Sequence, residues 1–279
     1  MNLFLRILSA VVLLPVVLSL AHLGGMYFLG FIAVAGALCS GEYAGMVAAE
    51  DRFAQRVFVL VATCVTVLAM LSTDAGAALL WMHGGALLLI ALFTLRTGDM
   101  KSVWSRMATL TFGLVYVSLG LVSVYRLRSL GDGMASQWAR PSWLYVALIA
   151  TWSNDTFAYF AGRAFGRHKL YEKVSPKKTW EGFAGGALGS VAMLFLCRIW
   201  FPSAFGHLSE VDLLAIGIPA AVLAPVGDLA ESLLKRTYGV KDSGNTIPGH
   251  GGLLDRVDAV FFVAPWTLLY AVVLRPLLL

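Results

Sequence analysis

The sequence predicts an all-α protein, a polytopic transmembrane bundle with about nine helical spans. Of the 279 residues, 59% are hydrophobic and only 13% are charged, whereas soluble domains average about 25% charged residues. Several apolar runs reach the roughly 20 residues that a helix needs to cross a bilayer. A large soluble domain with an extensive core does not explain the sequence, because these runs are too long and too free of charge.

Window hydropathy predicts the spans in chain order. They are residues 3–21, 25–44, 57–72, 76–95, 106–124, 142–161, 183–201, 211–234 and 257–278. The first span also resembles a signal peptide, since Arg6 precedes an apolar run that ends at Leu20. We interpret it as a retained span, because further spans follow at once and no clear small-residue cleavage site is present.

The basic residues predict the orientation of the chain. Sixteen of the 21 lysines and arginines lie near the N-terminus or in the loops after even-numbered spans. The positive-inside rule places these segments in the cytoplasm and, with nine spans, the C-terminus outside. The loop 125–141 opposes this assignment, because it carries Arg126, Arg128 and Arg140. With basic residues set between apolar runs, a net charge of +5 indicates contact with anionic phosphates, and we expect no nucleic-acid partner.

The first polar motif lies at the end of the eighth predicted span. Asp228, Glu231, Ser232 and Lys235 share one helical face, and Arg236 follows them. Ionisable groups at membrane depth are costly and usually face a site or a cavity. For Glu231 and Lys235, a salt bridge that supports helix packing is the alternative. Asp228 lies deeper in the span and has no evident local partner in the sequence.

The second motif is the polar loop that leads into the last predicted span. Its ionisable side chains include Lys241, Asp242, His250, Asp255 and Asp258. Pro248 and several glycines give the loop tight turns, and glycine lets backbone N–H groups approach a phosphate closely. The aspartates of this loop, facing Asp228, would suit Mg²⁺, which takes a few carboxylates together with waters and substrate phosphates. Helix capping is the alternative role for Asp258.

The third motif begins in the sixth predicted span and continues into the loop after it. Its polar residues are Asn154, Asp155, Arg163, Ser175, Lys177, Lys178 and Glu181. Two adjacent lysines beside a Ser-Pro turn suit a triphosphate, although a basic loop that only sets topology is the alternative. This motif therefore carries weight only together with the other two. Glu42 and His22 also lie in apolar surroundings, where we expect polar contacts between helices.

These motifs resemble the phosphatidate cytidylyltransferases, also called CDP-diacylglycerol synthases. The family signature reads Ser-x-x-Lys-Arg, four residues, Lys-Asp, then Pro-x-His-Gly-Gly, two residues, and Asp-Arg-x-Asp. The matching positions are Ser232, Lys235, Arg236, Lys241, Asp242, Pro248, His250, Gly251, Gly252, Asp255, Arg256 and Asp258. The blocks at 154–155 and 175–182 also resemble the family. The N-terminal half matches only as a set of membrane spans.

The resemblance implies a reaction in which CTP and phosphatidic acid give CDP-diacylglycerol and pyrophosphate. It also implies Mg²⁺ as cofactor, held by Asp228 and Asp255, with a monovalent cation such as K⁺ nearby, and a homodimer in a bacterial inner membrane. On this basis we expect residues 1–141 to be N-terminal helices that face lipid, mediate dimerisation or serve as a scaffold. Residues 142–279 would be the catalytic transmembrane domain, with its site facing the cytoplasm.

Roles for the remaining residues follow as hypotheses. Ser232 and Asp258 would support the metal site. Phosphates would be bound by Lys177, Lys178, Lys235 and Arg236. Loop ordering or neutralisation of the leaving group would fall to Lys241, Asp242 and His250. The nucleotide would also be contacted by Asn154, Asp155, Arg163, Ser175 and Glu181.

Three other functions compete with this interpretation. A CTP-dependent lipid kinase, or a cytidylyltransferase for another lipid phosphate, would share much of the polar site. A secondary transporter also places charges and glycines at broken helices, but it tends to show a matching pair of such helices, which this sequence lacks. A non-catalytic scaffold would not require the polar loop. Cys39, Cys64 and Cys197 are isolated in apolar stretches, so we expect neither disulfides nor zinc.

Overall fold

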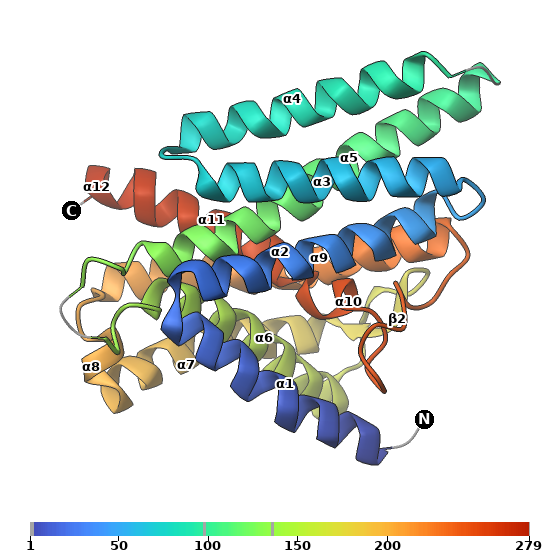
Figure 1. Ribbon diagram of the computed structural model, residues 1–279. Coiled ribbons are helices and arrows are strands. Elements are labelled where there is room, and N and C mark those ends of the chain that lie inside the picture. Colours follow the sequence, from blue (N-terminus) through green and yellow to red (C-terminus); the bar gives the residue numbers. More distant parts are fainter. Residues whose placement is uncertain (1–2, 97–98, 135–136, 279) are drawn as a thin grey trace. The chain divides into compact units, whose positions relative to one another are not determined.

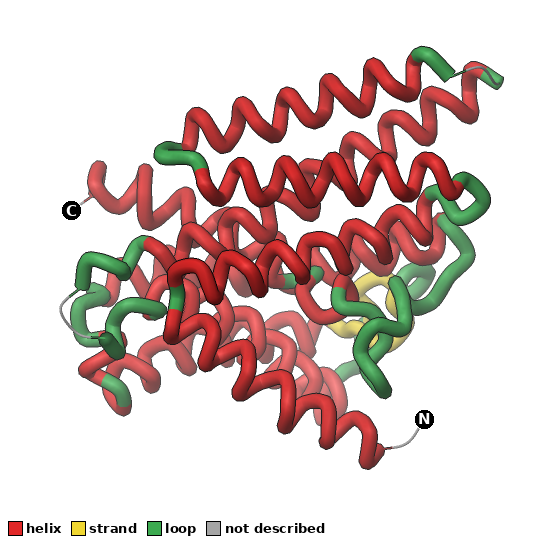
Figure 2. The backbone as a smooth tube through the Cα atoms, viewed as in Figure 1, coloured by secondary structure: helices red, strands yellow, loops and turns green. Residues whose placement is uncertain are grey.

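The computed structural model describes residues 3–96, 99–134 and 137–278, and helices account for most of this part of the chain (Figure 1, Figure 2). The predicted polytopic α-helical fold is confirmed. The long helices are α1 (Leu3–Leu23), α2 (Gly25–Val47), α3 (Arg52–Leu71), α4 (Ala75–Thr94), α5 (Met100–Ser129), α6 (Ser142–Phe165), α7 (Trp180–Trp200) and α9 (Glu210–Thr237). The last span joins α11 (Val260–Leu269), η1 (Tyr270–Leu274) and α12 (Arg275–Leu278). Two short helices are α8 (Pro202–Phe205) and α10 (Leu254–Val257).

Seven helical segments of the described chain are long and apolar enough to cross a membrane. They are α2, α3, α4, α5, α7, α9 and the segment from Val260 to Leu278. In α1, the apolar stretch is the shorter Val11–Leu23, whereas α6 has 24 residues and carries Asn154 and Asp155 within its length. The nine predicted spans therefore all correspond to helices, and seven of these meet the length and composition of a span by themselves.

The chain forms two compact units that are not divided at a single point in the sequence. One unit comprises residues 1–125 and 238–256, and the other comprises residues 126–237 and 257–279. The polar loop after α9 thus belongs with the N-terminal helices, although α9 itself belongs to the other unit. The functional division expected at residues 141 and 142 is a separate matter and stays a prediction.

In the first unit, Tyr43 fixes the packing of α2 on α5. Its side chain is fully buried, and its hydroxyl donates to the carbonyl of Thr109 at 2.8 Å. Gly113 makes room for the ring, because a Cβ at this position would lie 2.1 Å from it. Close helix approach through a small residue is typical of membrane proteins.

Asp51 of the same unit contacts residues at or near the ends of three helices. Its Oδ1 accepts the N–H of Ala54 at the start of α3, and its Oδ2 lies 2.5 Å from the guanidinium nitrogens of both Arg96 and Arg106. Burial alone would raise the pKa of Asp51, but the Ala54 N–H and the two guanidinium groups hold it below its usual range. The ends of α4 and α5 are therefore fixed beside the start of α3.

In the second unit, α7 packs on α6 through a row of glycines. A Cβ at Gly185 would lie 2.2 Å from the Cβ of Ala161, and one at Gly189 would lie 2.2 Å from the ring of Phe157. The absence of side chains on this face of α7 lets the two helices approach closely.

Helix α9 contains Pro219 and Pro225. Proline has no N–H, so the carbonyl four residues before each one loses its helical donor. Trp266 of α11 donates its Nε1–H to the carbonyl freed by Pro219 at 2.9 Å, and the Nδ2 of Asn154 of α6 lies 3.5 Å from the one freed by Pro225. Neighbouring helices thus supply the polar partners that a bilayer cannot provide.

A small hairpin connects α6 to α7. Strands β1 (Lys169–Tyr171) and β2 (Ser175–Thr179) run antiparallel and appear in yellow in Figure 2. The sequence analysis expected only a loop here, because strands this short show no alternating pattern that distinguishes them from a turn. The hairpin places β2 directly before α7.

Candidate active site

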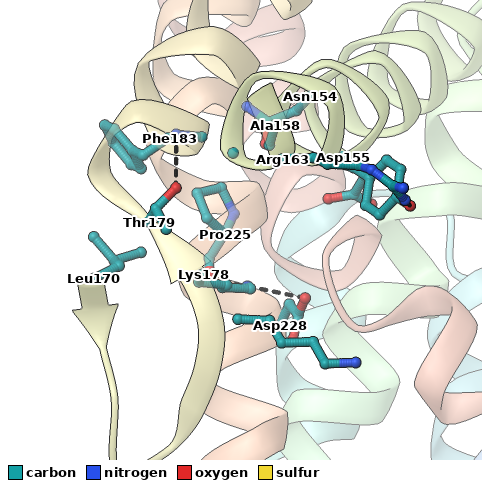
Figure 3. A pocket seen from close by; sticks show the side chains of 14 residues that line it. Asn154, Asp155, Ala158, Arg163, Leu170, Lys178, Thr179, Phe183, Pro225 and Asp228 are labelled. Atoms are coloured by element: carbon teal, nitrogen blue, oxygen red, sulfur yellow. Dashed lines mark hydrogen bonds and ion pairs between the residues drawn. The ribbon is translucent and has the colours of Figure 1, made fainter. Parts of the chain in front are cut away.

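A pocket of about 500 Å³ opens in the second unit. Residues of α6, the hairpin, the start of α7 and α9 line it, and Figure 3 shows it from close by. Its polar lining consists of Asn154, Asp155, Tyr159, Arg163, Lys177, Lys178, Thr179 and Asp228. The third sequence motif and the start of the polar stripe on α9 therefore meet in one pocket.

Asp228 and Lys178 form the central charged pair of this pocket. The Nζ of Lys178 lies 2.9 Å from the Oδ2 of Asp228, as the dashed line in Figure 3 shows, and it also donates to the carbonyl of Pro225 at 3.3 Å. On the other side, Ser232 donates to the Oδ1 of Asp228 at 3.2 Å. The carboxylate that seemed isolated in the sequence thus has a cation and a hydroxyl as partners.

The other residues of the polar stripe on α9 do not line the pocket, and two of them pair with each other. Lys235 donates to Glu231 at 2.9 Å within the same helix, and both side chains are largely buried. This is the helix-packing salt bridge that the sequence left open as an alternative. Arg236 is exposed, and neither Lys235 nor Arg236 lines the pocket. Their contacts to phosphates stay a prediction.

Four polar residues of α6 line the same pocket. Arg163 donates to the hydroxyl of Tyr159 at 3.0 Å, one helical turn away, and both side chains are exposed. Asp155 is exposed as well, whereas Asn154 is buried near the carbonyl freed in α9. Tyr159 and Thr179 are pocket residues that the prediction of site residues did not include.

Glu181 and Thr179 fix the hairpin to α7. Glu181 accepts the backbone N–H groups of Arg167 at 3.1 Å and His168 at 3.2 Å, and it lies 2.6 Å from the imidazole of His168. Thr179 caps α7 by accepting the N–H of Gly182. Glu181 and Ser175 do not line the pocket, so for Glu181 the structure shows a role in holding the lysine-bearing strand.

The loop 238–256 of the first unit holds the second group of predicted site residues. The Oδ2 of Asp255 accepts the N–H and the hydroxyl of Ser243, each at 2.9 Å, and the N–H of Gly252 at 3.0 Å. The Nδ1 of His250 lies 2.7 Å from the Oγ of Ser9 in α1. Lys241 and Asp242 are exposed. Within this loop, the Asp255 carboxylate thus accepts three hydrogen bonds from the loop itself.

The contacts of Glu42 differ from the one expected from the sequence. It was expected to make a polar contact between helices, but its carboxylate instead accepts hydrogen bonds from Ser243, Thr246, Leu253 and Leu254 of this loop. The reason is geometric, because the loop folds back onto α2 and buries the carboxylate under its own donors. A carboxylate in an apolar helix indicated that it has polar partners. These partners could not be identified from the sequence, because they lie about 200 positions away.

The carboxylate and hydroxyl oxygens of the predicted metal-site residues are ligands of the kind that a hard divalent cation binds. In the second unit, Ser232 is hydrogen-bonded to Asp228. Asp258 lies at the start of the last span, where this span packs closely on α9, since a Cβ on Gly227 would lie 2.7 Å from the carbonyl of Asp258. No cluster of three or more His, Cys, Asp or Glu side chains suited to a metal occurs in the part of the chain that the structure describes. Mg²⁺ commonly uses only one or two carboxylates and completes its shell with water and substrate phosphates.

Comparison with known proteins shows what the whole chain is similar to. The sequence model of the Cytidylyltransferase family matches residues 4–274. The phosphatidate cytidylyltransferase of Thermotoga maritima is 38% identical over 172 residues, which cover 60% of each chain. The Bacillus subtilis protein of the same name is 46% identical over 125 residues, or 45% of each chain. The matched segments of these two relatives thus span about half of their lengths, whereas the Brucella abortus protein of that name is 35% identical over 277 residues, 96% of this chain and 92% of its own.

Proposed function

Since this chain belongs to the cytidylyltransferase family, we propose that it is a phosphatidate cytidylyltransferase. In this reaction CMP passes from CTP to phosphatidic acid, which gives CDP-diacylglycerol and pyrophosphate. Relatives that carry this name match 96% of the chain in two cases and 45% to 60% of it in others. The protein would thereby supply an activated lipid for phospholipid biosynthesis.

One observation carries the proposal, the composition of the pocket in the second unit. It combines Arg163, Lys177 and Lys178 with the carboxylates Asp155 and Asp228, at the end of membrane helices. Its volume of about 500 Å³ lies within the range of small-molecule sites. Cations for phosphates next to carboxylates for a metal are the combination that transfer of a nucleotide between phosphates requires.

The reaction asks for positioning more than for covalent help from the protein. An oxygen of the lipid phosphate attacks the α-phosphorus of CTP in line, the bond from that phosphorus to the bridging oxygen breaks, and pyrophosphate leaves with the electron pair. A phosphate monoester is already mostly ionised near neutral pH, so no general base is assigned. Lys177, Lys178 and Arg163 would hold the phosphates in this alignment, and their charge would offset the negative charge of the phosphates.

Mg²⁺ would be held by Asp228 and Asp255, with Ser232 and Asp258 in support. When bound, it supplies Lewis-acid stabilisation to the phosphate oxygens. Ser232 would orient the Asp228 carboxylate through the hydrogen bond that it already donates. Lys241, Asp242 and His250 would order the loop around the leaving group. A K⁺ ion and a homodimer belong to the proposal through the family resemblance.

The protein would lie in the bacterial inner membrane with its N-terminus and its site facing the cytoplasm. CTP is a soluble nucleotide and phosphatidic acid is a membrane lipid, so the site must be open to both phases. The six lysines and arginines of the segment 162–182, which contains the hairpin, support this orientation.

The test is an assay of the purified protein in detergent with phosphatidic acid and CTP labelled in the cytosine ring. We expect label in the extracted lipid and an equal amount of pyrophosphate, both dependent on Mg²⁺. Label that stays in the aqueous phase would contradict the proposal. Release of CDP, together with transfer of phosphate to a lipid, would instead identify a CTP-dependent lipid kinase.

A further inference from the structure

Glu42 is a buried carboxylate that no step of the reaction uses. It lies in the C-terminal part of the apolar helix α2, and only 9% of its surface is exposed. Burying a charge of this kind is costly unless hydrogen bonds satisfy it. Its location therefore requires an explanation beyond helix packing.

The hydrogen-bond donors that the structure describes around this carboxylate all come from the loop 238–256. Oε1 accepts from the hydroxyl of Thr246 and from the N–H of Leu253 at 2.9 Å. Oε2 accepts from the hydroxyl of Ser243 at 3.2 Å and from the N–H of Leu254 at 2.8 Å. An ionised carboxylate only accepts hydrogen bonds and offers about four sites for them. Three donors and the Ser243 hydroxyl, whose single O–H is shared with Asp255, thus match its capacity, two to each oxygen.

The loop is shaped to wrap around this group. A Cβ on Gly252 would lie 1.9 Å from the Oγ of Ser243 and 2.6 Å from the Oε2 of Glu42, and one on Gly244 would lie 2.9 Å from the Cγ of Glu42. These glycines therefore allow the backbone to close over the carboxylate. The contact with Ser9 through His250 adds a second link between this loop and the N-terminal helices.

The same loop atoms also hold Asp255. The hydroxyl of Ser243 lies between Glu42 and Asp255, 3.2 Å from one carboxylate and 2.9 Å from the other. The amide of Leu254, which Glu42 binds, is directly followed by Asp255 in the chain. The position of the Asp255 carboxylate is thus determined by the segment that Glu42 binds.

We propose that Glu42 is a positioning residue for the cytidylyltransferase reaction. It holds residues 243–254 in the conformation that presents Asp255, and it acts through this loop rather than by touching substrate. The inference rests on the proposed function for its effect on catalysis, but its effect on the loop can be measured independently. It also gives the first two helices a role in the site beyond anchoring the chain in the membrane.

The test compares Glu42→Gln with Thr66→Val in the full-length protein in detergent. Glutamine keeps the size of the side chain but replaces one accepting oxygen by an amide that donates, so two loop donors lose their acceptor. Thr66 is a buried residue of the same unit whose Oγ1 lies 2.9 Å from the Oγ of Ser118, remote from the loop contacts. The control therefore removes a buried hydrogen bond without touching the segment 243–254.

Three readouts separate loop positioning from general destabilisation. For Glu42→Gln we expect amide hydrogen exchange in 243–254 to rise about 10-fold and kcat to fall about 10- to 100-fold, the range for groups that orient a site. KM for phosphatidic acid should stay within about 2-fold. Thr66→Val should leave loop exchange and kcat within about 2-fold. Unchanged loop exchange and kcat in Glu42→Gln, or equal losses in both variants, would overturn the inference.

Two milder variants keep the test decisive if Glu42→Gln does not fold. Ser243→Ala removes only the hydroxyl that links the two carboxylates, and Glu42→Asp keeps the charge on a side chain one methylene shorter. We expect Ser243→Ala to raise loop exchange and lower kcat less than Glu42→Gln, and wild-type behaviour in both milder variants would contradict the inference. If the wild-type protein makes no lipid-linked nucleotide, the proposed function fails, while the exchange comparison still decides whether Glu42 orders the loop.

Discussion

The ammonium group of Lys178 lies 2.9 Å from the Asp228 carboxylate, and the two side chains are 23% and 37% exposed. A pair this accessible to solvent contributes little to stability. Its value in the proposed site is chemical, since it keeps a cation and a proposed metal ligand at one place in a pocket that is open to ligands. If Asp228 bound a metal, the ammonium group of Lys178 would be free to pair with a phosphate.

Replacing the proposed metal ligands tests this arrangement. In Asp228→Asn and in Asp255→Asn we expect turnover to fall by at least about 100-fold at saturating Mg²⁺, since a ligand should matter at least as much as the groups that orient it. The measurement is pyrophosphate release from CTP in the presence of phosphatidic acid. Glu210→Gln is the matched control, because Glu210 begins the same helix α9 and is 73% exposed. Near-normal turnover in either asparagine variant would remove that residue from the metal site.

Lys178 can be tested for phosphate binding separately from its pairing with Asp228. In Lys178→Ala we expect KM for CTP to rise about 10-fold or more, because a hydrogen bond to a charged group contributes about 1.5–3 kcal/mol. Lys173→Ala serves as control, since Lys173 is an exposed residue of the same hairpin that does not line the pocket. If Lys178→Ala binds Mg²⁺ more tightly but keeps its KM for CTP, the lysine only neutralises Asp228.

At the level of the helices, the position of the pocket depends on the close approach of α6 and α7. The glycine face of α7 brings the hairpin, and with it Lys177 and Lys178, next to the polar end of α6. The hairpin is held in turn by Glu181 through the backbone N–H groups of residues 167 and 168. Helix packing thus determines where the side chains that we propose to bind phosphate lie.

Gly185→Ala tests the dependence on this packing. Its Cβ would lie 2.2 Å from that of Ala161, and overpacking of this kind costs about 1–3 kcal/mol. Gly84→Ala in α4 is the control, because a Cβ there meets nothing within 4 Å and alanine favours a helix by about 0.8–1 kcal/mol over glycine. Thermal unfolding in detergent should show a lower midpoint for the first variant and an equal or higher one for the second. Equal midpoints would mean that α7 can move away from α6 at no cost.

The helices could be predicted from the sequence because each is a local pattern. All nine predicted ranges coincide with helices, from 3–21 within α1 to 257–278 around α11 and α12, since an apolar run of sufficient length has few alternatives in a membrane. The hairpin was missed because its strands of three and five residues are fixed by Glu181 and not by a pattern of their own. Glu42 was assigned the wrong partner because the donors that surround it come from the far end of the chain.

For the molecule as a whole, three motifs that are separate in the sequence lie on different elements. The pair 154–155 lies midway along α6 and Arg163 in its last turn, Lys177 and Lys178 precede α7, and the signature block begins in the last turns of α9 and continues into the loop after it. The identity of their residue types could be read from the sequence. The Glu231–Lys235 pair could be named as an alternative from its i, i+4 spacing, whereas the pairing of Lys178 with Asp228 could not, because it depends on how the hairpin and α9 pack.

The proposed orientation in the membrane predicts on which side each end of α7 lies. We expect Lys173 in the hairpin to face the cytoplasm and Ser203 in α8 to face the opposite side, since one helix, α7, separates them. Each position can be replaced by cysteine in a chain whose Cys39, Cys64 and Cys197 are changed to alanine, and both side chains are exposed. A membrane-impermeant maleimide should label Ser203→Cys in intact spheroplasts and Lys173→Cys only after the membrane is opened. The reverse pattern would invert the assignment drawn from the basic residues and would place the pocket away from the cytoplasmic pool of CTP.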